Sequence, residues 1–169
     1  MTRSSVSLTI NGARHTAEVA PRVTLLDFLR DVVGLTGTHT GCEHGVCGAC
    51  SVLFDDTPIR ACLMFAVQAD GHRITTVEGL AETDGDLSLI QDCFWETHAL
   101  QCGYCTPGML IAAQALLQIN PDPSRQDIRK AISGNLCRCT GYGQIVEAIE
   151  LAADRLNQRD PAARADADD

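Results

Sequence analysis

The sequence has no apolar run long enough to span a bilayer, and its first residues contain no apolar segment of the kind found in secretory signals. Positive charge is also scarce, because 13 Lys and Arg residues stand against 22 Asp and Glu residues, for a net charge of −9. Nucleic-acid binding requires a basic face, so that class of function is excluded. These absences predict a cytoplasmic protein with no membrane insertion.

Cysteine is abundant by contrast, with nine residues in the chain. Cytoplasmic thiols stay reduced, so closely spaced cysteines there indicate metal ligands rather than disulfides. Eight cysteines fall into two groups with different spacing, and the ninth, Cys93, stands apart. The first cysteine group is Cys42, Cys47, Cys50 and Cys62, and the second cysteine group is Cys102, Cys105, Cys137 and Cys139.

The hydrophobic pattern divides the 169-residue chain into two parts. Apolar residues alternate with period two at first, with a hairpin turn at Asn11-Gly12, and recur with helical spacing after a boundary near residues 77–84. We therefore predict an α+β protein with one domain at 1–80 and a helical domain at 81–159. The acidic stretch 160–169 is typical of a solvated, flexible tail.

Local signals place the individual elements. The predicted strands are Val6–Ile10, His15–Val19, Ser51–Phe54 and Arg73–Val77. The predicted helices are Thr24–Leu35, Leu87–Leu100, Thr106–Asn120, Ser124–Ile132 and Gly143–Leu156. Thr24 and Thr106 are the expected N-caps of their helices, and Gly34 is the expected stop of the first one. We expect Leu25, Phe28, Leu29 and Val32 to share the buried face of the first helix, and Leu87, Ile90 and Phe94 that of the second.

The first cysteine group has the spacing C-x4-C-x2-C with a fourth cysteine further along, which is the plant-type ferredoxin signature. Three thiolates from one short loop must converge on two irons, and this requires unusual backbone angles. Gly41, Gly45 and Gly48 supply them, because glycine tolerates positive φ and lets backbone N–H groups approach the sulfurs. Zinc sites prefer paired C-x2-C spacings. The pattern therefore favours an iron–sulfur cluster over zinc.

The second cysteine group combines C-x2-C with C-x1-C. Ligands one residue apart cannot share a helix face, so Cys137 and Cys139 need an irregular turn, which the neighbouring glycines allow. Each cysteine pair precedes a predicted helix, whose free N–H groups and positive dipole end favour anionic thiolates. Taken alone, these residues leave an iron–sulfur cluster and a zinc ion both open at this site.

Three segments together resemble the iron–sulfur subunit of the xanthine oxidase-family molybdenum hydroxylases. They are GCEHGVCGAC (Gly41–Cys50), QCGYCTPGM (Gln101–Met109) and GNLCRCTGY (Gly134–Tyr142). The resemblance covers about residues 4–158, and no ligand position departs from the family pattern. In length the chain is similar to the small subunits of bacterial multi-subunit enzymes such as carbon monoxide dehydrogenase and the N-heteroaromatic oxidoreductases.

The resemblance implies a β-grasp ferredoxin domain followed by a four-helix domain, with a [2Fe-2S] cluster on each cysteine group. Gln101 matches a glutamine that hydrogen-bonds the pterin cofactor, and Cys139 matches a cysteine near the pterin edge. The chain would hold no catalytic residue. It would be the redox subunit of an oxidoreductase. Electrons would pass from the molybdopterin of a large subunit to the second cysteine group, then to the first cysteine group, and then to the FAD of a medium subunit.

The same resemblance implies a dimer of heterotrimers, with the pterin as a cytosine dinucleotide. Two other functions stay open: a free-standing two-cluster ferredoxin that carries electrons between proteins, and a structural zinc protein. A free carrier requires exposed clusters and has no use for a pterin-facing Gln101, which favours the subunit.

Several remaining residues have simpler interpretations. Cys93 lies on a predicted amphipathic helix and is expected to be a buried core thiol, since free cysteine is among the most buried residue types. Trp95 and Tyr104 are expected to serve in packing, and His44 to face solvent or a partner. Arg138, between two predicted ligands, could raise a cluster potential, pair with a partner subunit, or simply be solvated.

Overall fold

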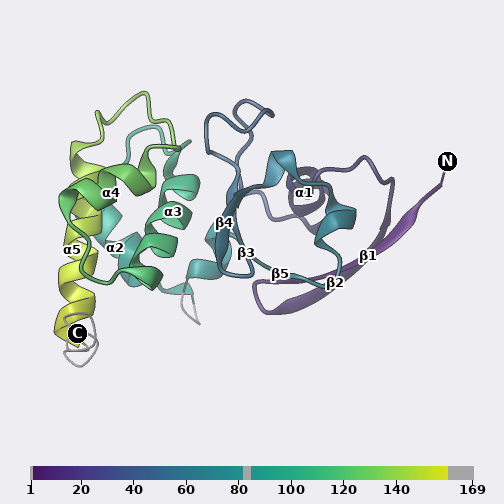
Figure 1. Ribbon diagram of the computed structural model, residues 1–169, viewed down its shortest axis with the longest axis horizontal. Helices are drawn as coiled ribbons and strands as arrows, with labels where there is room; N and C mark the ends of the chain where they lie inside the picture. Colours follow the sequence, from purple (N-terminus) through teal and green to yellow (C-terminus); the bar gives the residue numbers. More distant parts are fainter. Residues whose placement is uncertain (1, 82–84, 160–169) are drawn as a thin grey trace.

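The computed structural model describes residues 2–81 and 85–159. The predicted tail at 160–169 and part of the predicted boundary at 77–84 lie outside these residues. Figure 1 shows a sheet-containing half and a helical half side by side. Among the described residues, no helix is long and apolar enough to cross a membrane.

The N-terminal half contains a mixed sheet, described with five strands in the order β2-β1-β5-β3-β4. The strands are β1 (Ser4–Ile10), β2 (Ala13–Val19), β3 (Ser51–Phe54), β4 (Thr57–Arg60) and β5 (Arg73–Thr75). β1 runs parallel to β5 and antiparallel to β2, and β3 runs antiparallel to both β4 and β5. Alternate residues of β1 are buried, and Asn11 and Gly12 form the predicted turn with positive φ. The strand β4 was not predicted, and β5 stops before Val77, which begins a 3₁₀ turn.

The first helix follows the prediction at both ends but differs in its middle. Thr24 caps it, with its hydroxyl oxygen accepting from the Asp27 N–H at 3.1 Å, and Gly34 ends it at φ +87°. After α1 (Leu25–Asp27) the chain widens into a π-helix, Phe28–Val33. The wider turn changes the phase of the side chains. Val32 is therefore 46% exposed, and its predicted place in the core is wrong.

The helical half is built on α3. Its helices are α2 (Leu89–Glu96), α3 (Thr106–Ile119), α4 (Arg125–Ile132) and α5 (Gly143–Arg159). α3 is buried on nearly every face, as predicted, because it packs against α2 and α4 and also against strands β3 and β4 (Figure 1). This contact places the first turn of α3 next to the loops that carry the cysteines.

Three details of the helical half differ from prediction. Leu87 precedes α2 and is 46% exposed, because the Ser88 capping box with Gln91 starts the helix after it. Trp95 is 70% exposed rather than packed. Thr106 is not the N-cap of α3, because Cys105 holds that position and Pro107 lies in the first turn.

Candidate metal centres and the cavity between them

The first cysteine group lies on the loop between α1 and β3 and on the turn after β4. Its thiols form two pairs: Cys42 with Cys47, and Cys50 with Cys62. The first pair is half-buried, whereas Cys50 and Cys62 are buried beneath the sheet.

Two of the three glycines predicted to supply unusual backbone angles do so, and the prediction is wrong for Gly41. Gly45 and Gly48 have φ of +82° and +75°, a conformation that L side chains rarely adopt. Gly41 has an ordinary φ, but a Cβ atom there would lie 2.8 Å from the Cys47 Sγ. A side chain at Gly41 would therefore collide with a thiol, and one at Gly45 or Gly48 would meet Leu63 or the Gly134 carbonyl.

The thiols of the first group differ in their acidity. The Cys47 N–H points at the Cys42 Sγ at 3.4 Å, and this and other backbone N–H groups lower the pKa of Cys42 to about 6. Burial raises the pKa of Cys50 to about 11. The loop thus favours a thiolate at Cys42, whereas the buried Cys50 needs a bound cation to hold a negative charge.

The second cysteine group also forms two pairs, which join loops far apart in the sequence. The Cys139 and Cys102 Sγ atoms are 3.6 Å apart, and both residues are exposed. Cys105 hydrogen-bonds Cys137, and both pack against the helical core. Burial raises the pKa of Cys105 to about 12. In the described part of the chain, no three His, Cys, Asp or Glu side chains surround a position suited to a single metal ion.

Cys137 is held by its own turn. The Thr140 Oγ1 and amide nitrogen lie 3.0 Å and 3.4 Å from its Sγ, and the Tyr142 hydroxyl accepts from the Cys137 N–H at 2.9 Å. Burial acts to raise the pKa of Cys137, but the hydrogen bonds from Thr140, Cys139 and Cys105 together bring the pKa below its ordinary value. The turn therefore favours a thiolate at this position.

A cavity of about 150 Å³ is lined by cysteines of both groups. Its walls include Cys47 from the first group and all four cysteines of the second, together with Arg138. Beside it, the Leu136 N–H donates to the Cys47 carbonyl at 2.8 Å. Because Leu136 precedes Cys137, this one hydrogen bond connects a ligand loop of each half.

The other singled-out residues can now be placed. Gln101 is exposed next to Cys102, and Arg138 is exposed on the cavity wall. Cys93 is fully buried, as predicted, near the Arg155 guanidinium. His44 is exposed, as expected, and its Nδ1 hydrogen-bonds the Cys42 carbonyl.

Three residues with a role near the site were not singled out for it by sequence. Asn135 is 2% exposed, and its side chain forms a hydrogen bond between the two halves. Arg60 also forms a hydrogen bond between the halves. Tyr104 is 49% exposed, and its hydroxyl donates to the Thr40 carbonyl. The position of Asn135 just before a ligand turn was a usable signal, because polar residues there often support ligands. Arg60 offered none.

Comparisons with known proteins agree with this geometry. Residues 8–81 match the family model described as a 2Fe-2S iron-sulfur cluster binding domain, and residues 76–150 match the [2Fe-2S] binding domain. The chain is 55% identical to the caffeine dehydrogenase subunit gamma of Pseudomonas sp. (strain CBB1), over 89% of this chain and 91% of that one. It is 50% identical to the nicotinate dehydrogenase small FeS subunit of Eubacterium barkeri, over 92% and 98% of the two chains.

Among solved structures, the fold matches quinoline 2-oxidoreductase from Pseudomonas putida 86 with a TM-score of 0.88 and 51% sequence identity. The match covers 92% of this chain and 97% of that one, so both halves and their arrangement are shared. Two cluster-binding domains in one short chain, matched over nearly the full length of named small subunits, confirm the resemblance found in the motifs. The chain belongs to the small iron–sulfur subunits of the xanthine oxidase-family molybdenum hydroxylases.

Proposed function

We propose that each cysteine group of this electron-transfer subunit holds one [2Fe-2S] cluster, with each thiol pair on one iron. In the first group, Cys42 and Cys47 would bind one iron and Cys50 and Cys62 the other. In the second, the pairs would be Cys102 with Cys139 and Cys105 with Cys137. The observation that carries this assignment is the division of both groups into two pairs, which is what a two-iron cluster with four cysteine ligands requires.

The residues present fit such a cluster. The Cys47 N–H points at the Cys42 Sγ, and the Thr140 N–H points at the Cys137 Sγ. Donors of this kind stabilise thiolate sulfur and raise the reduction potential of a bound cluster. A [2Fe-2S] cluster, when bound, accepts and releases single electrons. The chain itself would hold the sulfur ligands, exclude water from Cys50 and Cys62, and fix one ligand loop against the other.

We infer the direction of electron flow from the family resemblance, and the exposure of the cysteines supports it. Cys102 and Cys139 form the exposed pair, with Gln101 beside them, so this end suits contact with a partner that carries the molybdopterin. From there the path runs inward to Cys105 and Cys137, across the shared cavity to the first cysteine group, and then to FAD on another subunit. Gln101 would bind the pterin, and no residue of this chain would be catalytic.

The same proposal gives the finer organisation. We assign a ferredoxin domain to 1–80 and a four-helix domain to 81–159. The assembly would be a cytoplasmic dimer of heterotrimers with a large molybdopterin cytosine dinucleotide subunit and a medium FAD subunit. The names of the relatives reported above refer to caffeine, nicotinate and quinoline. All three are N-heteroaromatic compounds, so we propose this class of substrate for the assembly.

The decisive experiment is metal analysis and EPR of the chain purified with its partners. We expect two distinct EPR signals on reduction, each integrating to about one spin, as for two plant-type clusters. Zinc in place of iron, or a single signal at full iron content, would contradict the assignment. Bleaching of the visible absorbance by caffeine, nicotinate or quinoline then tests the substrate class, and no response to any N-heteroaromatic compound would refute it.

A Gln101→Ala variant tests the pterin-facing end. Gln101 lies next to Cys102 and makes no contact that a cluster needs, so both EPR signals should keep their intensity. Reduction of the clusters by substrate should slow by about 10- to 100-fold, the range typical of losing a partner just outside a ligand set. Stopped-flow absorbance measures this rate, with Gln118→Ala on the exposed end of α3 as the control. A wild-type rate in Gln101→Ala would show that this glutamine has no role in coupling.

A further inference from the structure

We propose that Asn135 and Arg60, with the close contact of Gly108 and Gly48, form an interdomain clamp that sets the distance between the two clusters. This inference rests on the proposed function, because it concerns the passage of one electron from the reduced cluster of the second group to the oxidised cluster of the first. The members of the clamp are positioning residues: none of them is a proposed ligand.

Asn135 is the centre of the clamp. It is 2% exposed, and its side-chain amide donates to the Gly48 carbonyl at 3.0 Å. Gly48 directly follows Cys47, and Asn135 lies two residues before Cys137. The Leu136 N–H donates to the Cys47 carbonyl at 2.8 Å alongside. Two adjacent residues of one ligand loop are therefore bonded to two adjacent residues of the other.

The backbones also meet at a contact that excludes side chains. A Cβ atom on Gly108, in the first turn of α3, would lie 2.3 Å from the Gly48 carbonyl oxygen. A Cβ atom on Gly48 would lie 2.5 Å from the Gly134 carbonyl oxygen. Real Cβ atoms do not approach so closely, and the obstacles are backbone atoms that cannot rotate away. The halves can keep this spacing only with glycine at both positions.

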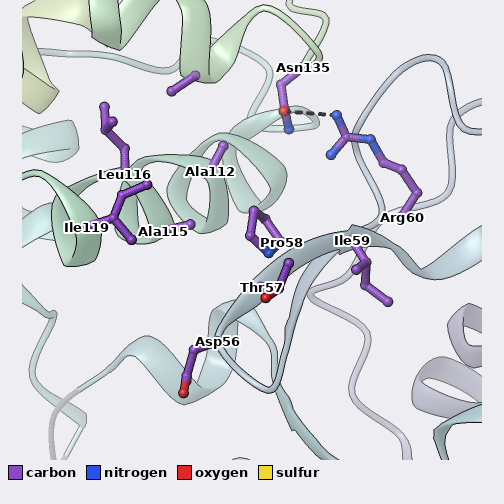
Figure 2. Close-up of a pocket in the computed structure, with 11 residues that line it drawn as sticks. Asp56, Thr57, Pro58, Ile59, Arg60, Ala112, Ala115, Leu116, Ile119 and Asn135 are labelled. Carbon is purple, nitrogen blue, oxygen red and sulfur yellow. Dashed lines mark hydrogen bonds between the residues drawn. The ribbon is translucent and has the colours of Figure 1, made fainter.

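Arg60 closes the clamp from the edge strand. Its guanidinium donates to the Gly134 carbonyl at 2.6 Å and to the Asn135 Oδ1 at 3.4 Å. Figure 2 shows this link at one end of a pocket of about 610 Å³, with β4 on one side and α3 on the other. The halves also meet at an apolar contact, where Leu53 of β3 packs against Ile111 and Ala115 of α3. The polar ties at the end of the pocket are made by the ligand loops themselves, so they set the position of one ligand loop against the other.

A second tie joins the other ligand loop. The Tyr104 hydroxyl, between Cys102 and Cys105, donates to the Thr40 carbonyl, and the Tyr104 ring stacks on His39 at a centroid distance of 4.8 Å. Both ligand loops of the helical half are thus bound to the ferredoxin half. Such double attachment resists hinge motion, which is the default for two small domains joined by a modest interface.

Pulsed dipolar EPR on the fully reduced, full-length chain in its assembly measures the distance between the clusters. Iron content and the two EPR signals are checked first, and their absence in the wild type would refute the proposed function rather than the clamp. The variants are Asn135→Ala, Gly108→Ala and the milder Arg60→Met, with Asn120→Ala at the end of α3 as the matched control.

We expect one narrow distance in the wild type and in Asn120→Ala, and a longer or broader distribution in Asn135→Ala and Gly108→Ala, with both signals retained. Arg60→Met is expected to show a smaller broadening, and it carries the test alone should both of these variants fail to fold. A broad wild-type distribution overturns the clamp. So does an unchanged narrow distance in every variant that folds.

Discussion

Replacing Cys50 by serine is expected to remove the ferredoxin-type cluster and to stop electron delivery to the flavin. Cys50 is 2% exposed and pairs with Cys62 beneath the sheet. A serine hydroxyl there cannot supply the soft thiolate that iron–sulfur sites require. The assembly should lose half of its cluster iron and one of its two EPR signals. Flavin reduction by substrate should fall by more than the roughly 10- to 100-fold typical of mutations outside a ligand set.

The helical half should be unaffected in this variant. Its four cysteines lie on other loops, and Cys105 and Cys137 pack on a separate hydrophobic core, so the second cluster should still be reduced by substrate. Cys93→Ala is the matched control, because Cys93 is equally buried but is not a proposed ligand. It should cost about 1 kcal/mol of stability and leave the iron content unchanged. Loss of iron in Cys93→Ala, or full flavin reduction in Cys50→Ser, would contradict the ligand assignment.

The sequence was sufficient wherever the structure depends on local signals. The hairpin at Asn11-Gly12 and the buried helix α3 were both predictable, because their residues carry the necessary turn chemistry and periodicity. The spacing of the cysteines also predicted the two groups that are proposed as ligand sets. Their division into pairs was not, since Cys102 meets Cys139 across 37 positions of the chain.

The wrong secondary-structure predictions arose where the surrounding structure outweighs the local preference of the residues. The phase of the first helix was wrong because a π-helix, Phe28–Val33, follows three ordinary helical residues, and Val32 turns outward as a result. The strand β4 was missed because it is short and contains Pro58, which is tolerated there because β4 lies at the edge of the sheet.

The contacts between the halves could not be read from the sequence for a related reason. Arg60 and Gly134 are 74 positions apart, and neither has a neighbour in sequence that indicates the other. A buried asparagine such as Asn135 must find hydrogen-bond partners, but only the folded chain shows that Gly48 provides one. The proposed electron path depends on such pairs, because electron transfer requires the two ligand loops to be close together.

Replacing Cys105 by serine should interrupt the path one step earlier. Cys105 pairs with Cys137 on the inner side of the second group, and burial raises the pKa of its thiol to about 12. The thiolate there depends on bound metal, and the metal in turn depends on the thiolate. Serine is a good N-cap, so α3 should keep its first turn when Cys105 changes. The expected loss is therefore the second cluster, with half of the cluster iron, rather than the fold.

The two cysteine variants together test the order of the path. In Cys105→Ser, substrate should still reduce the molybdenum centre, but the ferredoxin-type EPR signal should appear only after addition of dithionite. In Cys50→Ser, substrate alone should produce the signal of the second cluster. The asymmetry is expected because Cys102 and Cys139 are exposed at the proposed entry, whereas Cys50 and Cys62 lie beyond the shared cavity. If substrate reduced the ferredoxin-type cluster in Cys105→Ser at the wild-type rate, electrons would have to reach the first cysteine group without passing through the second.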